Sequence, residues 1–175
     1  MNIQEIEAQV RQIPDFPSEG ILFMDILPIL KSPAHFQGLT RHLSDLAGDI
    51  DCVVGIEARG LILGAAIAMQ IDKGFVPLRK AGKLPGEVRS ISYGLEYGKD
   101  VIEIQKDILN PGEKVMLIDD VLATGGTLIA GVKLLRECGV QIQSVVVALE
   151  ISGLPGRAEF EREFPDLKLH ALMVK

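Results

Sequence analysis

A stretch near residue 120 combines residue types that could bind a sugar phosphate. Segment 115–127 has the sequence VMLIDDVLATGGT, in which an apolar run precedes two adjacent carboxylates, Asp119 and Asp120. After two more residues comes a run of small and hydroxyl-bearing residues: Ala123, Thr124, Gly125, Gly126 and Thr127. The first amides of a helix lack an intrahelical partner and bind anions, and glycine lets the backbone approach phosphate oxygens. Because the carboxylates would suit vicinal hydroxyls or a hydrated Mg²⁺, a sugar phosphate would satisfy both halves of the segment.

The spacing in this segment excludes two common nucleotide-binding motifs. It has neither the GxxxxGK[ST] pattern of a P-loop nor the GxGxxG pattern of dinucleotide-binding folds. One alternative stays open from the residues alone: TGGT at 124–127 could be an ordinary turn between a strand and a helix, with the acids in the N-cap region. The position of the acids favours a site, because ligands of open α/β sheets bind at the carboxyl ends of strands.

Apolar patterns along the chain predict strands that alternate with helices. Strands are expected at 52–56, 75–79, 101–105, 115–119, 144–150 and near 168–173. Helices are expected at 3–12, from 33 to about 48, at 60–72 and at 127–138. Strand 115–119 is apolar on both faces, as a central parallel strand should be. The alternation predicts an α/β fold with a central, mostly parallel sheet flanked by helices.

Composition favours a single domain, here residues 1–175, in a soluble protein. The chain has 175 residues, of which 47% are hydrophobic, and this is enough for one good core. A net charge of −6 argues against a protein that coats nucleic acid. The longest apolar stretch, 60–71, is shorter than the roughly 20 residues that cross a bilayer, and the start lacks a signal-peptide pattern. We therefore expect a cytoplasmic protein without nucleic-acid or membrane partners.

The segment at about 80–100 differs from the rest of the chain. It is rich in glycine and charge and shows no helical period. A loop of this length in a compact domain is normally functional or disordered. We expect a flexible lid.

Several segments resemble one enzyme family. Segment 115–127 resembles the phosphoribosyl pyrophosphate motif of type I phosphoribosyltransferases. Four others resemble the adenine phosphoribosyltransferase family: FPSEGILFMDILPIL at 16–30, EARG at 57–60, LRKAGKLPGE at 78–87 and YGLEYGKDVIEIQKD at 93–107. The resemblance runs from about residue 10 to residue 164. It implies a type I phosphoribosyltransferase fold, with a small N-terminal hood for the base within about 1–32 and a flexible catalytic loop at about 80–100.

The same resemblance implies a reaction of purine salvage. A 5-phosphoribosyl group would pass from phosphoribosyl pyrophosphate to adenine, giving AMP and pyrophosphate through an oxocarbenium-like transition state. The donor would lie against Asp119, Asp120 and the run at 123–127. The cofactor Mg²⁺ would be held near these two acids through substrate oxygens and water, without a direct protein ligand. The family also implies a homodimer.

Four cations are candidates for the pyrophosphate. Arg59 follows strand 52–56 directly and, by resemblance, would lie near both the pyrophosphate and the base, where it would act in catalysis. Arg79, Lys80 and Lys83 cluster at the start of the long loop and would suit the pyrophosphate. In the family this loop serves pyrophosphate partly from the neighbouring subunit. The alternatives are a surface arginine at a turn and a solvated basic loop.

The resemblance also assigns the acid–base group and the base site. Glu96 would handle the proton on the purine, and Tyr97 would close the loop over the site. Phe23 would stack on adenine, and Ile151 would contact its other face; either could instead belong to the core. Met24 stands where the family usually has arginine, but in the family the main chain of this segment does most of the reading of the base.

Two other functions compete with transfer to adenine. A phosphoribosyltransferase for xanthine, guanine or orotate would share the donor motif, although the hood segment 16–23 and the LEYG at 95–98 favour adenine. A non-catalytic sensor of phosphoribosyl pyrophosphate would also use this pocket. Such regulators usually carry a DNA-binding module or a basic face, for which an acidic chain of 175 residues leaves little room.

Overall fold

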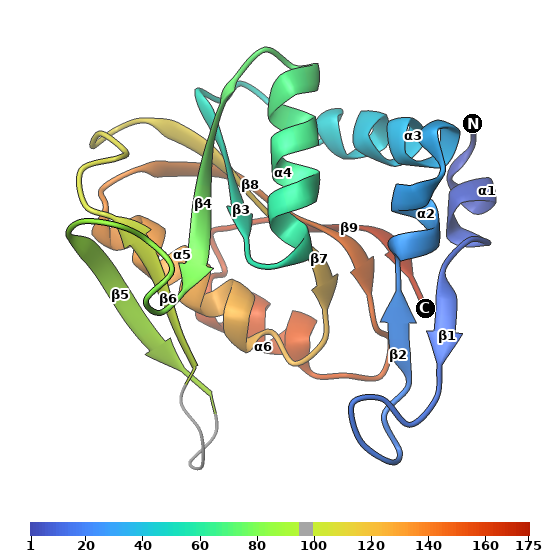
Figure 1. The fold of residues 1–175 in the computed structure, drawn as a ribbon. Coiled ribbons are helices and arrows are strands. Elements are labelled where there is room, and N and C mark those ends of the chain that lie inside the picture. The colour runs from blue at the N-terminus through green and yellow to red at the C-terminus, as the bar shows by residue number, and fades with distance from the viewer. Residues whose placement is uncertain (95–99) are drawn as a thin grey trace.

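A seven-stranded sheet with helices on both faces forms the body of the molecule (Figure 1). The computed structural model describes residues 1–94 and 100–175, and the elements named here are those within these ranges. The helices are α1 Ile3–Glu7, α2 Leu27–Lys31, α3 Pro33–Ser44, α4 Arg59–Gln70, α5 Gly126–Glu137 and α6 Gly156–Glu163. The strands are β1 Arg11–Ile13, β2 Phe23–Asp25, β3 Cys52–Ile56, β4 Gly74–Lys80, β5 Val88–Tyr93, β6 Asp100–Gln105, β7 Lys114–Leu122, β8 Gln141–Glu150 and β9 Leu169–Val174.

The order of strands in the main sheet is β5-β6-β4-β3-β7-β8-β9. The five strands from β4 to β9 in this order run parallel, whereas β5 and β6 pair antiparallel at one end. This arrangement confirms the predicted α/β fold with a mostly parallel sheet. In the described part of the chain, no helix has the length and apolar character needed to span a membrane.

Alternate residues of the central strands enter two separate cores. Val54 and Leu117 pack on the side of α5 and α6, with Phe160 of α6. Val53 and Met116 pack on the other side, with the apolar faces of α3 and α4. Successive side chains of a strand point to opposite faces, so a strand that is buried on both sides must be apolar throughout. This is why β3 and β7 are continuous apolar runs.

At β3 the chain changes the side on which it adds strands to the sheet. From β3 the chain passes to β4 on one side, and it returns later to place β7 on the other side, paired with β3 from Cys52↔Val115 to Gly55↔Ile118. The loops that leave β3 and β7 therefore diverge to opposite faces of the sheet, and they leave a crevice between them. The residues that follow these two strands are the ones to which the sequence assigns chemistry.

The N-terminal segment departs from its predicted helix. A helix was expected at 3–12, but α1 ends at Glu7 and residues Arg11–Ile13 form β1, which pairs antiparallel with β2. The capping box of Asn2 and Glu5 starts the helix as expected. Pairing with a distant strand then overrides the helical period of the apolar residues. Helix α2 is an addition to the predicted elements, and α3 ends at Ser44 rather than near residue 48.

A long loop was expected at about 80–100, but part of this segment forms a strand, β5. Its residues Val88–Tyr93 pair in register with β6, from Val88↔Gln105 to Tyr93↔Asp100. Burial along β5 is only partial, and this explains why its sequence carries little strand signal. The expected strand 115–119 is longer than predicted too, since β7 continues to Leu122 and includes both acids.

Candidate active site

The residues after β3 and the end of β7 meet in a polar contact. Arg59 begins α4, and its Nε donates a hydrogen bond to Oδ2 of Asp120 in an ion pair. The Arg59 side chain is 30% exposed and that of Asp120 9%. The guanidinium carbon also lies 5.2 Å from the centre of the Phe23 ring. Arg59 thus links the sheet to the small N-terminal β1–β2 sheet.

The two acids of β7 serve different sides of the strand. Asp120 lines a large cavity under β2, whereas Asp119 lines a small cavity formed by the following loop. Because both belong to one strand, their side chains point to opposite faces. The backbone N–H of Asp120 donates to Oδ1 of Asp119 at 2.8 Å. Burial, and next the negative charge of Asp120, raise the pKa of Asp119 well above its usual value.

The loop between β7 and α5 has the shape of a cradle. It encloses a cavity of about 80 Å³, lined by Asp119 and by residues 121–128. Gly125, the N-cap of α5, has a φ of +87°, a conformation that favours glycine. The N–H of Ile129 bonds to the carbonyl of Gly125 at 2.9 Å, so the amides before Ile129 have no partner within the helix. A volume of this size suits one phosphate group rather than a nucleotide.

The large cavity has a volume of about 670 Å³ and lies between β2 and the ends of β7 and β8. It brings together seven residues that the sequence singled out: Phe23, Met24, Arg59, Asp120, Ala123, Thr124 and Ile151. Seven others were missed: Gly20, Ile21, Leu22, Val121, Ser152, Gly153 and Leu154. Each of these lies within three residues of a predicted residue in the chain, which is the signal that could have found them. Its mainly apolar wall with a few polar groups suits a flat ligand with polar edges.

Phe23 and Met24 lie on opposite sides of the short strand β2. The Phe23 ring is half-buried and meets Phe16 edge-on, with ring centres 5.1 Å apart. Met24 is only 5% exposed and packs in the core between the sheet and α3 and α4. Its side chain is therefore mainly a core residue, although Met24 contributes to the cavity wall.

Asp25 anchors this wall, and the sequence analysis did not single it out. Its carboxylate is buried and accepts hydrogen bonds from the Leu27 N–H at 2.9 Å and from Arg11 Nη2 at 2.5 Å. Burial opposes ionisation, but these donors hold the pKa of Asp25 below its usual value. A carboxylate within the apolar run FMDIL was the available signal.

Three of the four predicted pyrophosphate cations lie away from both cavities in the described part of the chain. Arg79 donates to Glu57 from Nε at 3.1 Å and from Nη2 at 3.2 Å. Lys80 donates through Nζ to Asp100 at 2.5 Å and to the Tyr93 hydroxyl at 3.1 Å. Lys83 is exposed.

Glu96 and Tyr97 lie outside the described residues. The acid–base role of Glu96 and the closing role of Tyr97 stay predictions.

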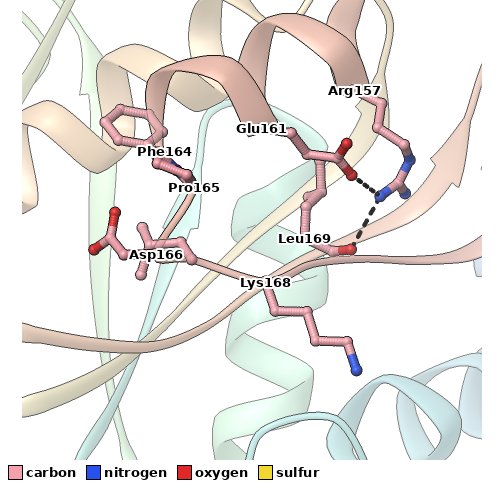
Figure 2. Close-up of a pocket in the computed structure, with 8 residues that line it drawn as sticks. Arg157, Glu161, Phe164, Pro165, Asp166, Lys168 and Leu169 are labelled. Carbon is pink, nitrogen blue, oxygen red and sulfur yellow. Dashed lines mark hydrogen bonds and ion pairs between the residues drawn. The ribbon is translucent and has the colours of Figure 1, made fainter.

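A second hollow of about 600 Å³ lies between α6 and the segment 164–169 that leads into β9 (Figure 2). Three of its four charged residues are already engaged, since Arg157 pairs with Glu161 and Asp166 pairs with Arg136. It shares no lining residue with the large cavity and contains none of the predicted site residues. The cavity beside Asp120 is therefore the candidate site.

Comparison with known proteins identifies the family. Residues 26–166 match the model of the phosphoribosyl transferase domain. The chain is also 44% identical over 175 residues to the adenine phosphoribosyltransferase of Acidobacterium capsulatum, covering 99% of this chain and 94% of that protein. The chain belongs to the adenine phosphoribosyltransferase family. The family predicted from segment 115–127 and its companion segments is thereby confirmed.

Solved structures of this family have the same fold. The adenine phosphoribosyltransferase of Thermoanaerobacter pseudethanolicus superposes with a TM-score of 0.92 at 39% identity, covering 99% of this chain and 100% of that one. The enzyme of Saccharomyces cerevisiae superposes with a TM-score of 0.88 at 39% identity, with 97% of each chain covered. That yeast structure contains an imino-altritol bisphosphate together with adenine. The type I phosphoribosyltransferase fold predicted for this chain is confirmed.

Proposed function

We propose that this chain transfers the 5-phosphoribosyl group of phosphoribosyl pyrophosphate to adenine and releases AMP and pyrophosphate. One observation carries the proposal: β7 ends between an anion cradle of about 80 Å³ and a mainly apolar cavity of about 670 Å³, with one carboxylate on each side. A nucleoside monophosphate needs this combination, because its phosphate, ribose and base require an anion site, hydroxyl acceptors and a flat apolar slot. The yeast relative was solved with an imino-altritol bisphosphate and adenine, and this pair of ligands supports the proposal.

The donor would lie along the end of β7. The cradle at 123–127 would hold its 5-phosphate through the first amides of α5. Asp119 and Asp120 would accept hydrogen bonds from the ribose hydroxyls. Positive charge develops at C1′ as pyrophosphate departs, so nearby carboxylates favour the transition state electrostatically. Because Asp120 already pairs with Arg59, the guanidinium would balance its charge before the donor binds.

Adenine would occupy the cavity beneath β2. Phe23 would stack on one face of the base and Ile151 would contact the other, since both line the same cavity. Met24 would contribute through its main chain, because its side chain is packed in the core. Glu96 would act on the purine proton and Tyr97 would close the site.

The residues at the end of β7 suit Mg²⁺. Carboxylate oxygens and water are its preferred ligands, and Asp119 and Asp120 offer carboxylates beside the cradle. In residues 1–94 and 100–175, no group of three His, Cys, Asp or Glu side chains is placed to bind a metal by itself. The ion would therefore be held near Asp119 and Asp120 through donor oxygens and water, without a direct protein ligand. When bound, Mg²⁺ supplies charge neutralisation for the leaving pyrophosphate.

We also propose a homodimer in which residues 1–175 form one domain per subunit. Helix α4 carries exposed apolar side chains along one side, Ile62 at 44% and Met69 at 83%. Residues seven apart lie on the same helical face, and an exposed apolar patch is typical of an interface. Arg79, Lys80 and Lys83 would then serve pyrophosphate across the dimer. Sedimentation analysis of the wild type and of Met69→Glu tests this, with a dimer and a weakened dimer expected.

The test of the activity is pyrophosphate release from phosphoribosyl pyrophosphate and Mg²⁺ with each base offered separately. Adenine, guanine, hypoxanthine, xanthine and orotate are compared. We expect turnover with adenine. Turnover with another base instead would leave the donor chemistry in place and reject the assignment of the base, whereas donor binding without turnover of any base would indicate a sensor. The cytoplasmic location and the absence of nucleic-acid and membrane partners stay predictions.

A further inference from the structure

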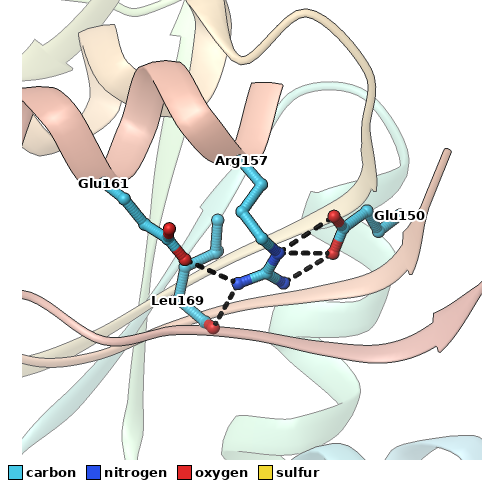
Figure 3. A network of polar contacts seen from close by, with 4 residues as sticks. All are labelled: Glu150, Arg157, Glu161 and Leu169. Atoms are coloured by element: carbon cyan, nitrogen blue, oxygen red, sulfur yellow. Dashed lines mark hydrogen bonds and ion pairs between the residues drawn. The ribbon is translucent and has the colours of Figure 1, made fainter. Parts of the chain in front are cut away.

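Arg157 lies outside the candidate cavity but joins three elements behind its wall (Figure 3). Its Nε donates to both carboxylate oxygens of Glu150 at 2.9 Å, and its Nη2 donates to Oε2 at 2.5 Å. Its Nη1 donates to Glu161 at 3.2 Å and to the backbone carbonyl of Leu169 at 3.2 Å. Glu150 ends β8, Glu161 lies on α6 and Leu169 begins β9. One guanidinium therefore ties α6 to the ends of two strands.

The segment that Arg157 and Glu150 bracket forms part of the cavity wall. Residues 151–155 connect β8 to α6, and the first four of them line the cavity of about 670 Å³. Residues 152–155 are exposed, and Gly153 has a φ of +80° with open space around it. The hydrogen bonds of segment 151–155 lie at its two ends. Ile151 N–H donates to Leu122 and Ser152 donates to Lys175, and at the other end the Pro155 carbonyl accepts from the Glu159 N–H. A short exposed segment with little packing of its own takes its position from its two ends.

The start of α6 also supports the phosphate cradle. The Gly156 N–H donates to the carbonyl of Ala123 at 3.1 Å. A Cβ on Gly156 would clash with that same carbonyl, and a Cβ on Gly125 would lie 2.9 Å from the Gly156 carbonyl oxygen. The backbone of the cradle and the first turn of α6 are thus in direct contact. Arg157 directly follows Gly156 in α6. A displacement of α6 would therefore move both the phosphate cradle, through Gly156, and the cavity wall at 151–154, which leads into α6.

Arg157 itself cannot touch a ligand in the cavity. Its side chain borders the second hollow, shown in Figure 2, which shares no lining residue with the cavity. The pair is well shielded for a surface contact, with the Glu150 side chain 14% exposed and that of Arg157 34%. A bidentate pair of this kind imposes direction as well as attraction. Its effect on a ligand must pass through the segment that it holds.

From these contacts we propose that Arg157, through Glu150 and Leu169, is a positioning residue that places segment 151–154 against the base and the start of α6 against the phosphate cradle. The inference rests on the proposed function. Removal of the guanidinium would let the segment move while the core stays packed. The base is held directly by this segment and the phosphate is held only by the neighbouring loop, so the base should be affected more.

The experiment measures KM and kcat with the base that the wild type turns over, for Arg157→Met, Arg157→Lys, Glu150→Gln and the double variant Glu150→Gln with Arg157→Met. We expect Arg157→Met to raise KM for the base about tenfold and KM for the donor about threefold, with kcat within about threefold of wild type. Lysine should restore only part of the loss, because it cannot bond Glu150 and the Leu169 carbonyl as a fork. The double variant should be no worse than Arg157→Met alone, since both changes remove one contact.

Arg162→Met is the matched control. It removes an ion pair with Glu159 on the same helix, and the Arg162 side chain is 70% exposed. Its KM values should equal those of the wild type.

A purely structural role for Arg157 would lower the folded fraction and hence the apparent kcat, and would leave both KM values unchanged; that result overturns the proposal. If Arg157→Met does not fold, Glu150→Gln, which keeps the shape of the side chain, decides by the same criterion. Turnover by the wild type with unchanged KM in the variants rejects this inference alone. Absence of turnover with every base rejects the proposed function and this inference together.

Discussion

The proposed phosphate cradle and the proposed base cavity share the end of β7 but are built in different ways. The cradle is lined by one continuous stretch of chain between Asp119 and Leu128. The larger cavity is lined by residues from four separate stretches of chain: 20–24, Arg59, 120–121 with 123–124, and 151–154. An anion can be held by consecutive backbone amides in one turn, whereas a flat base needs walls on both faces. The first site is thus a local structure, and the second exists only where distant segments meet.

The largest effect on activity is expected from a substitution that distorts the backbone of the cradle. Gly125→Ala puts a side chain at a φ of +87°, with its Cβ 2.9 Å from the carbonyl oxygen of Gly156. We expect kcat/KM for the donor to fall about 100-fold, because the phosphate loop must shift. Initial rates at varied donor concentration measure this.

Gly112→Ala is the control for Gly125→Ala. Gly112 has the same φ of +87°, but nothing lies within 4 Å of its added Cβ. We expect a loss of about 1 kcal/mol in stability and unchanged kinetics. Equal kinetic losses in both variants would mean that backbone strain, and not the cradle, is responsible.

Removal of the Phe23 ring should weaken binding of the base and leave binding of the donor nearly unchanged. We expect Phe23→Ala to raise KM for adenine about tenfold, which corresponds to the loss of one stacking contact, while KM for the donor stays within about twofold. Phe16→Ala removes only the ring that meets Phe23 edge-on, so its effect should be smaller. Kinetics with each substrate varied in turn provide the measurement. A parallel rise of both KM values would contradict the separation of base site and cradle.

Asp119→Asn should stabilise the protein while it impairs the reaction. Burial and the charge of Asp120 raise the pKa of Asp119 above its value in the unfolded chain. The folded state therefore binds this proton more tightly, so its contribution to stability is present at acid pH and is lost as pH rises through the folded pKa. Asparagine removes this loss, and we expect a gain of about 1 kcal/mol at neutral pH.

Urea unfolding of wild type and Asp119→Asn across the range from acid to neutral pH measures the difference. The advantage of the variant should grow with pH. A constant difference would show that the carboxyl group does not titrate as its burial implies.

The smallest effect is expected at Met24, on the core side of β2. Met24→Leu nearly conserves volume in a well-packed core, so it should cost less than about 1.5 kcal/mol. KM for adenine should change by less than about twofold and the preferred base should stay the same. The pyrophosphate-release assay with five bases measures both. A change of preferred base would mean that the Met24 side chain, and not only its main chain, reads the ligand.

Much of the sheet could be predicted because its strands carry their own signal. The runs at 52–56 and 115–119 are apolar on both faces, which is typical of strands buried on both sides. Strand β5 was missed since it is only partly buried and pairs only with β6. Strand β1 was missed because its residues continue a helical period, and the partner that makes them a strand lies ten or more residues away.

The candidate site divides in the same way. The sequence by itself determined which residues form the proposed cradle, since the two acids and the run at 123–127 are neighbours in the chain and precede a helix whose first amides are suited to anions. Only the tertiary structure decided that Asp119 and Asp120 face different cavities, because β7 continues through both acids and alternates their side chains. The tertiary structure also decided that Arg157 pairs with Glu150, next to the segment 151–154 that lines the large cavity. Contacts between segments far apart in the chain leave no spacing in the sequence from which they could be predicted.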